Sequence, residues 1–109
     1  MIRSVLRLTP GPAGVQPVVD FYERREVLSR ALAGGCHTVA LHVRLPKRDE
    51  VLVTAVWPSE EHYQTWATSI SRADDVAELQ HLLAGDGEVG TAELYDVVGS
   101  AGPVNGAAS

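Results

Sequence analysis

The segment from Val51 to Ser69, VLVTAVWPSEEHYQTWATS, contains two successive elements of secondary structure. Its first part, which ends at Trp57, is apolar on both faces, and this is typical of a strand covered on both sides. Pro58 interrupts the strand, and Ser59 is a good N-cap for a helix whose first residues are acidic. Aromatic residues up to Trp66 lie on one side of that helix, so the segment predicts a strand followed by a helix packed on the sheet.

The rest of the chain predicts further strands and helices around this segment. The expected strands are residues 2–8, 39–45 and 91–98, and the expected helices are one long helix from residue 17 to Gly34 and a later one capped by Ser71. The order β-α-β-β-α-α-β predicts an α+β fold, a ferredoxin-like sandwich with helices on one face of an antiparallel sheet. Residues 1–98 should form this domain, and residues 99–109 a flexible C-terminal tail.

Composition excludes several classes of function. The chain has 109 residues and a formal charge of -5, and its nine basic residues are scattered rather than gathered into a stripe. Binding to nucleic acid or to an anionic membrane surface is therefore not expected. The one cysteine, Cys36, cannot form an intrachain disulfide. Since the sequence shows no signal peptide and no membrane-spanning run, a cytoplasmic protein is expected.

The segment from Val51 to Ser69 resembles the signature of the antibiotic biosynthesis monooxygenase family, which belongs to the dimeric α/β barrel superfamily. The resemblance lies in a strand that ends in Trp, a Ser-Glu helix start, and an aromatic residue followed by Trp one turn later. The order of elements extends it over residues 1–98. It implies a homodimer in which two sheets form a barrel, with a pocket in each subunit between the sheet and the helices. Apolar residues on both faces of the strands agree with a second subunit on the open face.

The resemblance also implies a function. Members of this family include oxygenases that oxidise aromatic polyketides with molecular oxygen and without a metal or flavin. We therefore expect a cofactor-independent monooxygenase-like enzyme that acts on an aromatic or polyketide-type intermediate of secondary metabolism, with oxygen as co-substrate. The alternative is a non-oxidative cyclase or a ligand-binding tailoring protein of the same fold.

Another branch of the family degrades haem, and its residues can be compared with this chain one by one. That branch uses an Asn on the first strand, a Trp on the helix after the third strand, and an iron-ligating His on the next helix. Trp66 matches the Trp, but Ser4 stands at the Asn position and Val76 near the His position. His81 comes about five residues too late, so haem is disfavoured as a cofactor.

Three residues are the candidates for catalysis. Trp66 could stack on a flat substrate and hydrogen-bond a carbonyl through its indole N–H. His62, one turn earlier on the same helix, could act as a general base, although an exposed position in the first turn is the simpler interpretation. His42 is the second candidate base if its strand face looks toward the helices; if that face looks toward a second subunit or solvent, His42 is structural.

Four residues are the candidates for substrate binding. Tyr22 and Tyr63 could donate hydrogen bonds to a substrate oxygen, and Phe21 accompanies Tyr22 on one apolar helix stripe. Arg44 shares a strand face with His42 and could bind an anion. No two histidines have the spacing of a metal site within one element, so no metal is expected.

Overall fold

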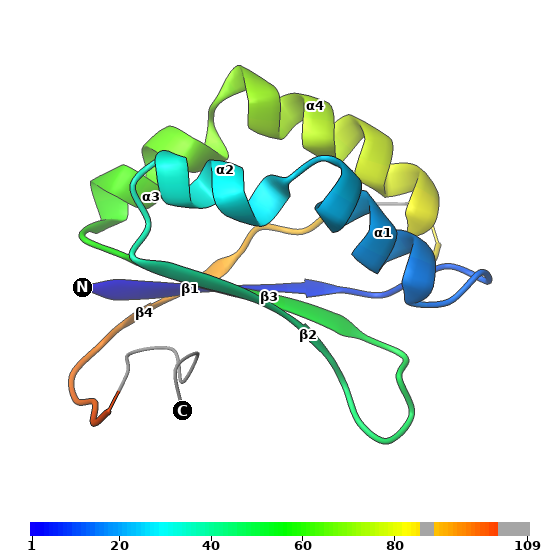
Figure 1. Cartoon of the computed structure of the whole chain (residues 1–109), viewed down its shortest axis with the longest axis horizontal. Coiled ribbons are helices and arrows are strands. Elements are labelled where there is room, and N and C mark those ends of the chain that lie inside the picture. Colours follow the sequence, from blue (N-terminus) through cyan, green and yellow to red (C-terminus); the bar gives the residue numbers. More distant parts are fainter. Residues whose placement is uncertain (86–88, 103–109) are drawn as a thin grey trace.

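The computed structural model describes residues 1–85 and 89–102 (Figure 1). The strands are β1 (Ile2–Leu8), β2 (Thr38–Val43), β3 (Val51–Trp57) and β4 (Glu93–Asp96). The helices are α1 (Gln16–Arg24), α2 (Val27–Ala33), α3 (Glu60–Ala67) and α4 (Ile70–Leu79), and a short 3-10 turn, η1 (Gln80–Leu82), follows α4.

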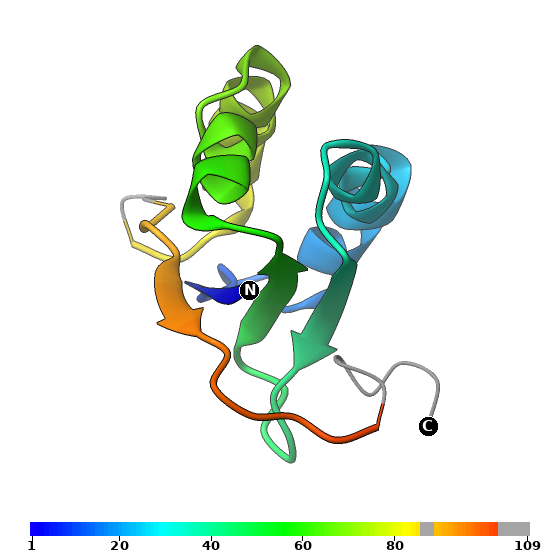
Figure 2. The ribbon, with the colours of Figure 1, turned by 90° about the vertical axis from the view of Figure 1, so that its left-hand side faces the viewer.

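The four strands form one antiparallel sheet in the order β2-β3-β1-β4. All the described helices lie on one face of the sheet. Helices α1 and α2 form one pair, and helices α3 and α4 form a second pair beside it (Figures 1 and 2). The predicted α+β, ferredoxin-like arrangement is therefore confirmed. The barrel of two subunits stays a prediction.

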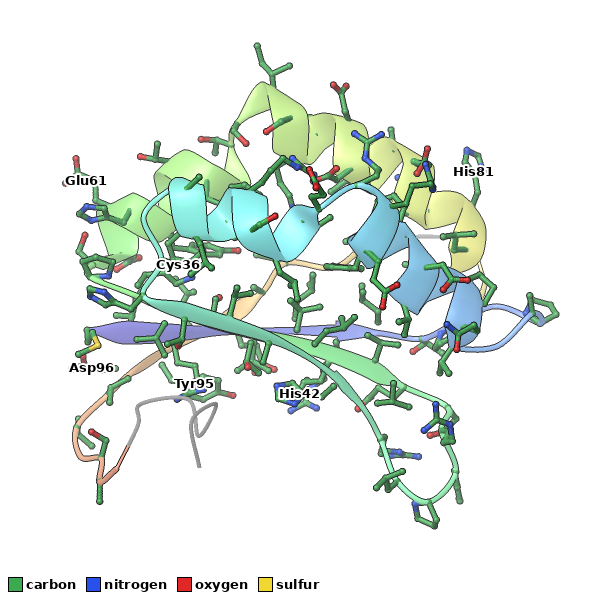
Figure 3. All side chains as sticks on the ribbon, viewed as in Figure 1. Cys36, His42, Glu61, His81, Tyr95 and Asp96 are labelled. Atoms are coloured by element: carbon green, nitrogen blue, oxygen red, sulfur yellow. The ribbon has the colours of Figure 1, made fainter. Side chains whose placement is uncertain are left out.

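Strand register fixes which side chains face the helices. Leu6 of β1 pairs with Val53 of β3, which in turn pairs with Leu41 of β2, and these three side chains belong to the helix-covered face. One residue further along β2, His42 pairs with Leu52. Because successive side chains of a strand alternate between faces, His42 lies on the face opposite the helices (Figure 3).

Trp57 and Ser4 form a buried polar contact at the end of the central strands. Trp57 is 1% exposed, and its indole Nε1 donates a hydrogen bond of 3.0 Å to the Ser4 hydroxyl. A buried indole N–H needs such a partner, and Ser4 supplies it from the neighbouring strand.

Both ends of β3 and the Ser59 N-cap of α3 match the prediction.

The predicted long helix before Gly34 is wrong in one respect, because it is two helices. Glu26 has φ +52°, in the left-handed region, and separates α1 from α2. The break shifts the phase of the second helix, so Val27 and Ala31 are buried whereas Leu32 is 49% exposed. An uninterrupted apolar stripe does not show this change, since it assumes a constant helical period.

Several boundaries also differ from the prediction. Ser69 caps α4 in place of Ser71, since its hydroxyl accepts a hydrogen bond of 3.2 Å from the Arg72 amide. Strand β2 ends at Val43, and Leu45 beyond it is 72% exposed. The last strand covers only Glu93–Asp96. Residues 103–109 of the predicted tail lie outside the described residues.

Candidate functional site

A cavity of about 200 Å³ lies beside Trp66, between the sheet and the second pair of helices. Its walls are Leu6 of β1, residues of α3 and α4, and the segment that leads into β4. The lining residues are Leu6, Tyr63, Trp66, Ala67, Arg72, Val76, Val89, Gly90, Thr91 and Ala92. The position agrees with the pocket between sheet and helices that the sequence resemblance implies.

A second, much smaller cavity of about 40 Å³ adjoins the first. It lies between the two helix pairs and the sheet, and Trp66 and Arg72 line both spaces. Tyr22, Val39 and Trp57 are among its other walls. Trp66 therefore lies between two cavities of different size. The larger one can hold an aromatic ring, and the smaller one can hold one or two water molecules.

Helix α3 presents Trp66 to these cavities. Capping by Ser59 fixes the start of the helix, and the half-buried indole of Trp66 then packs at 6.4 Å from the Trp57 ring, with an interplanar angle of 32°. The guanidinium of Arg30 lies 5.9 Å from the Trp66 ring centre, a cation–π distance. Trp66 thus contacts both a buried tryptophan and a cation, and these contacts restrict its rotamer.

Two polar groups beside Trp66 are buried and, apart from a contact between their own two side chains, have no hydrogen-bond partner among the described residues. They are the hydroxyl of Tyr22 and Nη1 of Arg72. Tyr22 is 2% exposed and the Arg72 side chain 11% exposed. Burial without a partner costs free energy, and such groups are uncommon in folded proteins.

Asp75 is fully buried and forms ion pairs with three arginines, Arg25, Arg30 and Arg72. It accepts hydrogen bonds from Arg30 Nη2 at 2.7 Å on both carboxylate oxygens and from Arg25 Nε at 2.9 Å. Arg72 Nη1 lies 3.8 Å from Asp75 Oδ2, beyond hydrogen-bond distance. Asp75 is therefore committed mainly to Arg25 and Arg30, which leaves Arg72 able to face the cavities.

The two tyrosines of the site are harder to ionise than tyrosine in water. Burial raises the pKa of Tyr22, and the charge of the nearby Arg72 guanidinium and its hydrogen-bond contact with the Tyr22 hydroxyl oppose part of that rise. Burial also raises the pKa of Tyr63, with Arg72 and the Ala92 amide in opposition. Both hydroxyls are therefore protonated at neutral pH and can act as hydrogen-bond donors.

The structure does not bring the two candidate histidines to the cavity of Trp66. His62 is exposed, its Nδ1 lies 2.7 Å from the Ser59 hydroxyl, and it lines a separate surface hollow with Gly34. His42 is on the other face of the sheet, where its Nε2 lies 3.0 Å from the Thr54 hydroxyl (Figure 3). Their catalytic roles stay predictions.

The other predicted residues divide in the same way. Tyr63 lines the larger cavity and Tyr22 the smaller one. Phe21 is 1% exposed in the core, edge-on to Tyr22 at 5.6 Å, and lies behind the smaller cavity's wall rather than in it. Arg44 belongs to the turn after β2 and forms an exposed bidentate pair with Asp49.

Arg72 and Asp75 are site residues that sequence reasoning missed. Each occurs among charged residues on a helix with exposed sides, so nothing marked them as buried. No local signal marks them, because the arginines that pair with Asp75 are Arg25 and Arg30, which lie 50 and 45 residues earlier in the chain on either side of the break at Glu26. Cys36, by contrast, is buried, and burial raises the pKa of its thiol, which makes it a poor nucleophile.

The cavity does not offer the ligands that a haem group requires. Val76 lines the wall where the haem-degrading branch places its iron-ligating histidine, and the Ser4 hydroxyl is engaged by Trp57. His81 is exposed at the outer end of the helix layer, away from the sheet (Figure 3). Within residues 1–85 and 89–102, no group of three or more His, Cys, Asp or Glu side chains could hold a metal ion.

Comparison with solved structures identifies the fold. Rv0793 from Mycobacterium tuberculosis superposes with a TM-score of 0.75 at 15% identity, over 93% of this chain and 98% of that one. A protein named antibiotic biosynthesis monooxygenase superposes with a TM-score of 0.73 at 18% identity, over 91% and 100% of the two chains. A protein of unknown function from Nitrosomonas europaea gives 0.72 at 17%, over 94% and 93%.

The chain therefore has the ferredoxin-like fold of the antibiotic biosynthesis monooxygenases, as the sequence resemblance predicted. No family model matches the sequence, and no curated protein matches it either. None of the described helices has the length and hydropathy that a membrane span requires.

Proposed function

We propose that this protein is a cofactor-independent, monooxygenase-like enzyme that oxidises a small aromatic or polyketide-type molecule of secondary metabolism with molecular oxygen. The observation that carries the proposal is the cavity beside Trp66, in a fold shared with proteins named as monooxygenases. The cavity combines an aromatic wall with a buried cation, Arg72, and the protonated hydroxyl of Tyr63.

The proposed reaction starts from a phenol or enol that loses its proton. The resulting anion transfers an electron to molecular oxygen, and the carbon radical and superoxide combine to form a peroxide. Loss of water then breaks the O–O bond and leaves a carbonyl group. A methylene compound and O2 thus give a ketone and water, and the four electrons lost by carbon reduce both oxygen atoms.

The protein's tasks in this reaction are to hold the ring, favour the anion and exclude bulk water. Trp66 serves as the stacking platform, and the Tyr63 hydroxyl on the same helix hydrogen-bonds a substrate oxygen. His62 stays the predicted base on the solvent side of α3. The stabilisation of negative charge inside the cavity lowers the demand on any base, because it makes the substrate a stronger acid.

Cavity size limits the substrate. Sites for drug-sized ligands usually enclose about 300–1,000 Å³. The space beside Trp66 is about 200 Å³, and this favours a molecule of one or two fused rings. Larger polyketide intermediates would need the walls formed by residues 89–92 to move.

Oxygen uptake tests the proposal directly. We expect the purified protein to consume oxygen with dihydroxynaphthalene, at a rate above that of autoxidation and with one O2 consumed and one water released per quinone formed. Anthrone, with three rings, should react more slowly. Trp66→Ala should lower kcat/KM by about tenfold or more because the ring loses its platform, whereas Trp66→Phe should retain part of the activity. No uptake above autoxidation with either compound would contradict an oxygenase function.

One observation favours the alternative of a non-oxidative cyclase. Among residues 1–85 and 89–102, no histidine or carboxylate lines the larger or the smaller cavity, whereas hydrogen-bond donors for an oxyanion are present. Such donors would stabilise the enolate of an intramolecular aldol closure as well as that of an oxygenation. A cyclase would convert its substrate at the same rate in the absence of oxygen, so anaerobic assays separate the two functions.

A further inference from the structure

The buried Tyr22 hydroxyl and Arg72 Nη1 contact each other, have no further hydrogen-bond partner among the described residues, and border a common space. The Tyr22 side chain reaches it from α1 and Arg72 from α4, and both line the cavity of about 40 Å³. An unsatisfied buried polar group costs about 1–3 kcal/mol, and more when it is charged. This cost would be recovered if an acceptor atom occupied the small cavity.

The sizes of the two cavities indicate how a ligand would lie. The smaller space is of the size of one or two oxygen atoms, whereas the larger one, about 200 Å³, can take an aromatic ring. Trp66 and Arg72 line both spaces. A flat molecule against Trp66 in the larger cavity would therefore direct a ring oxygen toward Arg72 and Tyr22.

The charges around these cavities favour an anion. Arg72 faces Asp75 at 3.8 Å, but Asp75 is hydrogen-bonded to Arg25 and Arg30. Glu78, on the same helix, pairs with Arg24 at 2.7 Å and contacts Arg25 at 3.9 Å. Four guanidinium groups thus share two carboxylates, and Arg72, which lines both cavities, is the one among them without a hydrogen bond to either carboxylate.

We infer that Arg72 and Tyr22 bind the ionised oxygen of a phenol or enol, so that the ligand of this site is an acidic aromatic held as its anion. The inference takes the location of the substrate beside Trp66 from the proposed function. Arg72 supplies charge and Tyr22 supplies a neutral hydroxyl donor, which together act as an oxyanion site. Binding of the anion requires no oxygen and can be measured separately from turnover.

The probe is 4-nitrophenol, whose anion absorbs visible light and whose neutral form does not. A spectroscopic pH titration of the bound probe in the absence of oxygen gives its apparent pKa. We expect binding to lower that pKa by about one unit or more, which means about a tenfold preference for the anion. The ether 4-nitroanisole, which cannot ionise, should bind at least about tenfold more weakly than 4-nitrophenolate.

Variants assign the effect to particular groups. Arg72→Met should abolish the pKa shift, Arg72→Lys should retain part of it, and Tyr22→Phe should weaken it while leaving the charge in place. Arg7→Met is the matched control, because Arg7 is an exposed arginine of β1 on the other face of the sheet. It should not change the shift.

Equal binding of both probes to the unaltered protein, or an unchanged shift in Arg72→Met, would overturn the inference. The comparison of the two probes needs no variant, so it decides the matter even if Arg72→Met does not fold. An anion preference without oxygen uptake would support the inference and contradict the oxygenase proposal. Oxygen uptake without an anion preference would do the reverse.

Discussion

Trp57 and Trp66 are in contact, but their surroundings differ in kind. Trp57 is fully enclosed and its N–H is bonded to Ser4, so it contributes to the stability of the sheet. Trp66 is half-buried and borders both cavities. A substitution at Trp57 should therefore act on folding, whereas one at Trp66 should act on ligand binding.

Tyr22 provides a prediction about alkaline stability. Its pKa in unfolded protein is about 10, and burial raises the native value. Above pH 10 the unfolded state has fewer bound protons at this residue than the native state, so the free energy of unfolding falls as pH rises. Below about pH 10, Tyr22 is protonated in both states and contributes no pH dependence to the free energy of unfolding.

The Tyr22→Phe variant should therefore lose less stability between about pH 10 and 12 than the unaltered protein. Urea unfolding at a series of pH values measures this, and tyrosinate absorbance should show one late-titrating tyrosine fewer. A parallel decline of both proteins across this range would show that Tyr22 ionises as freely in the native state as in the unfolded one.

At the scale of elements, the cap of α4 distinguishes two serines. Ser69→Ala removes the hydroxyl that accepts from the Arg72 amide and should lower the free energy of unfolding by about 0.5–2 kcal/mol. Ser71 is exposed inside the first turn, and Ser71→Ala should change stability by less than about 0.5 kcal/mol. Chemical denaturation of the pair compares them, and the opposite order would place the cap at Ser71.

The break between α1 and α2 can be tested by the sign of the stability change that a glycine substitution at Glu26 produces. Glu26 is exposed and has φ +52°, a conformation that costs a residue with a Cβ about 1–2 kcal/mol. Glu26→Gly should therefore stabilise the protein or leave it unchanged, as measured by the midpoint of denaturation. If the helix were continuous, glycine there would instead destabilise it by about 1 kcal/mol relative to a helix former.

These elements show where sequence reasoning succeeded and where it failed. The span of β3 and the start of α3 were predictable because Pro58 and Ser59 mark the boundary locally. The break at Glu26 was not, because no glycine or proline marks it; Arg25 and Arg30, on either side of it, pair with Asp75 of a helix distant in sequence. Arg72 could not be predicted as a site residue for the same reason, because its burial depends on contacts between helices that are distant in sequence.

At the scale of the whole molecule, the sheet has one face covered by helices and one that carries mixed side chains. Val5, Leu52 and His42 lie on the latter, together with Tyr95, which is 49% exposed. We propose that this face joins a second copy of the chain, as the resemblance to the dimeric α/β barrel superfamily implies. His42 would then belong to the interface rather than to the cavity.

Sedimentation velocity tests this proposal. We expect a species of twice the 11.7 kDa chain mass at micromolar concentration, and a Tm that rises with protein concentration. Leu52→Asp places a carboxylate on the open face of the central strand and should produce a monomer. Glu60→Asp, on the exposed start of α3, serves as the control. A monomer at all concentrations would contradict the proposed assembly.

The central claim is that the cavity beside Trp66, and not another part of the molecule, binds the aromatic ligand. Two-dimensional ¹H–¹⁵N spectroscopy tests it, because the chain has two indole N–H groups, and Trp66→Phe assigns their signals. On anaerobic titration with 4-nitrophenolate, the indole N–H signal of Trp66 should shift saturably. Its shift should exceed that of the Trp57 signal, because the Trp57 N–H is hydrogen-bonded to the Ser4 hydroxyl. Saturable binding that leaves the Trp66 signal unmoved would place the ligand elsewhere and contradict the account.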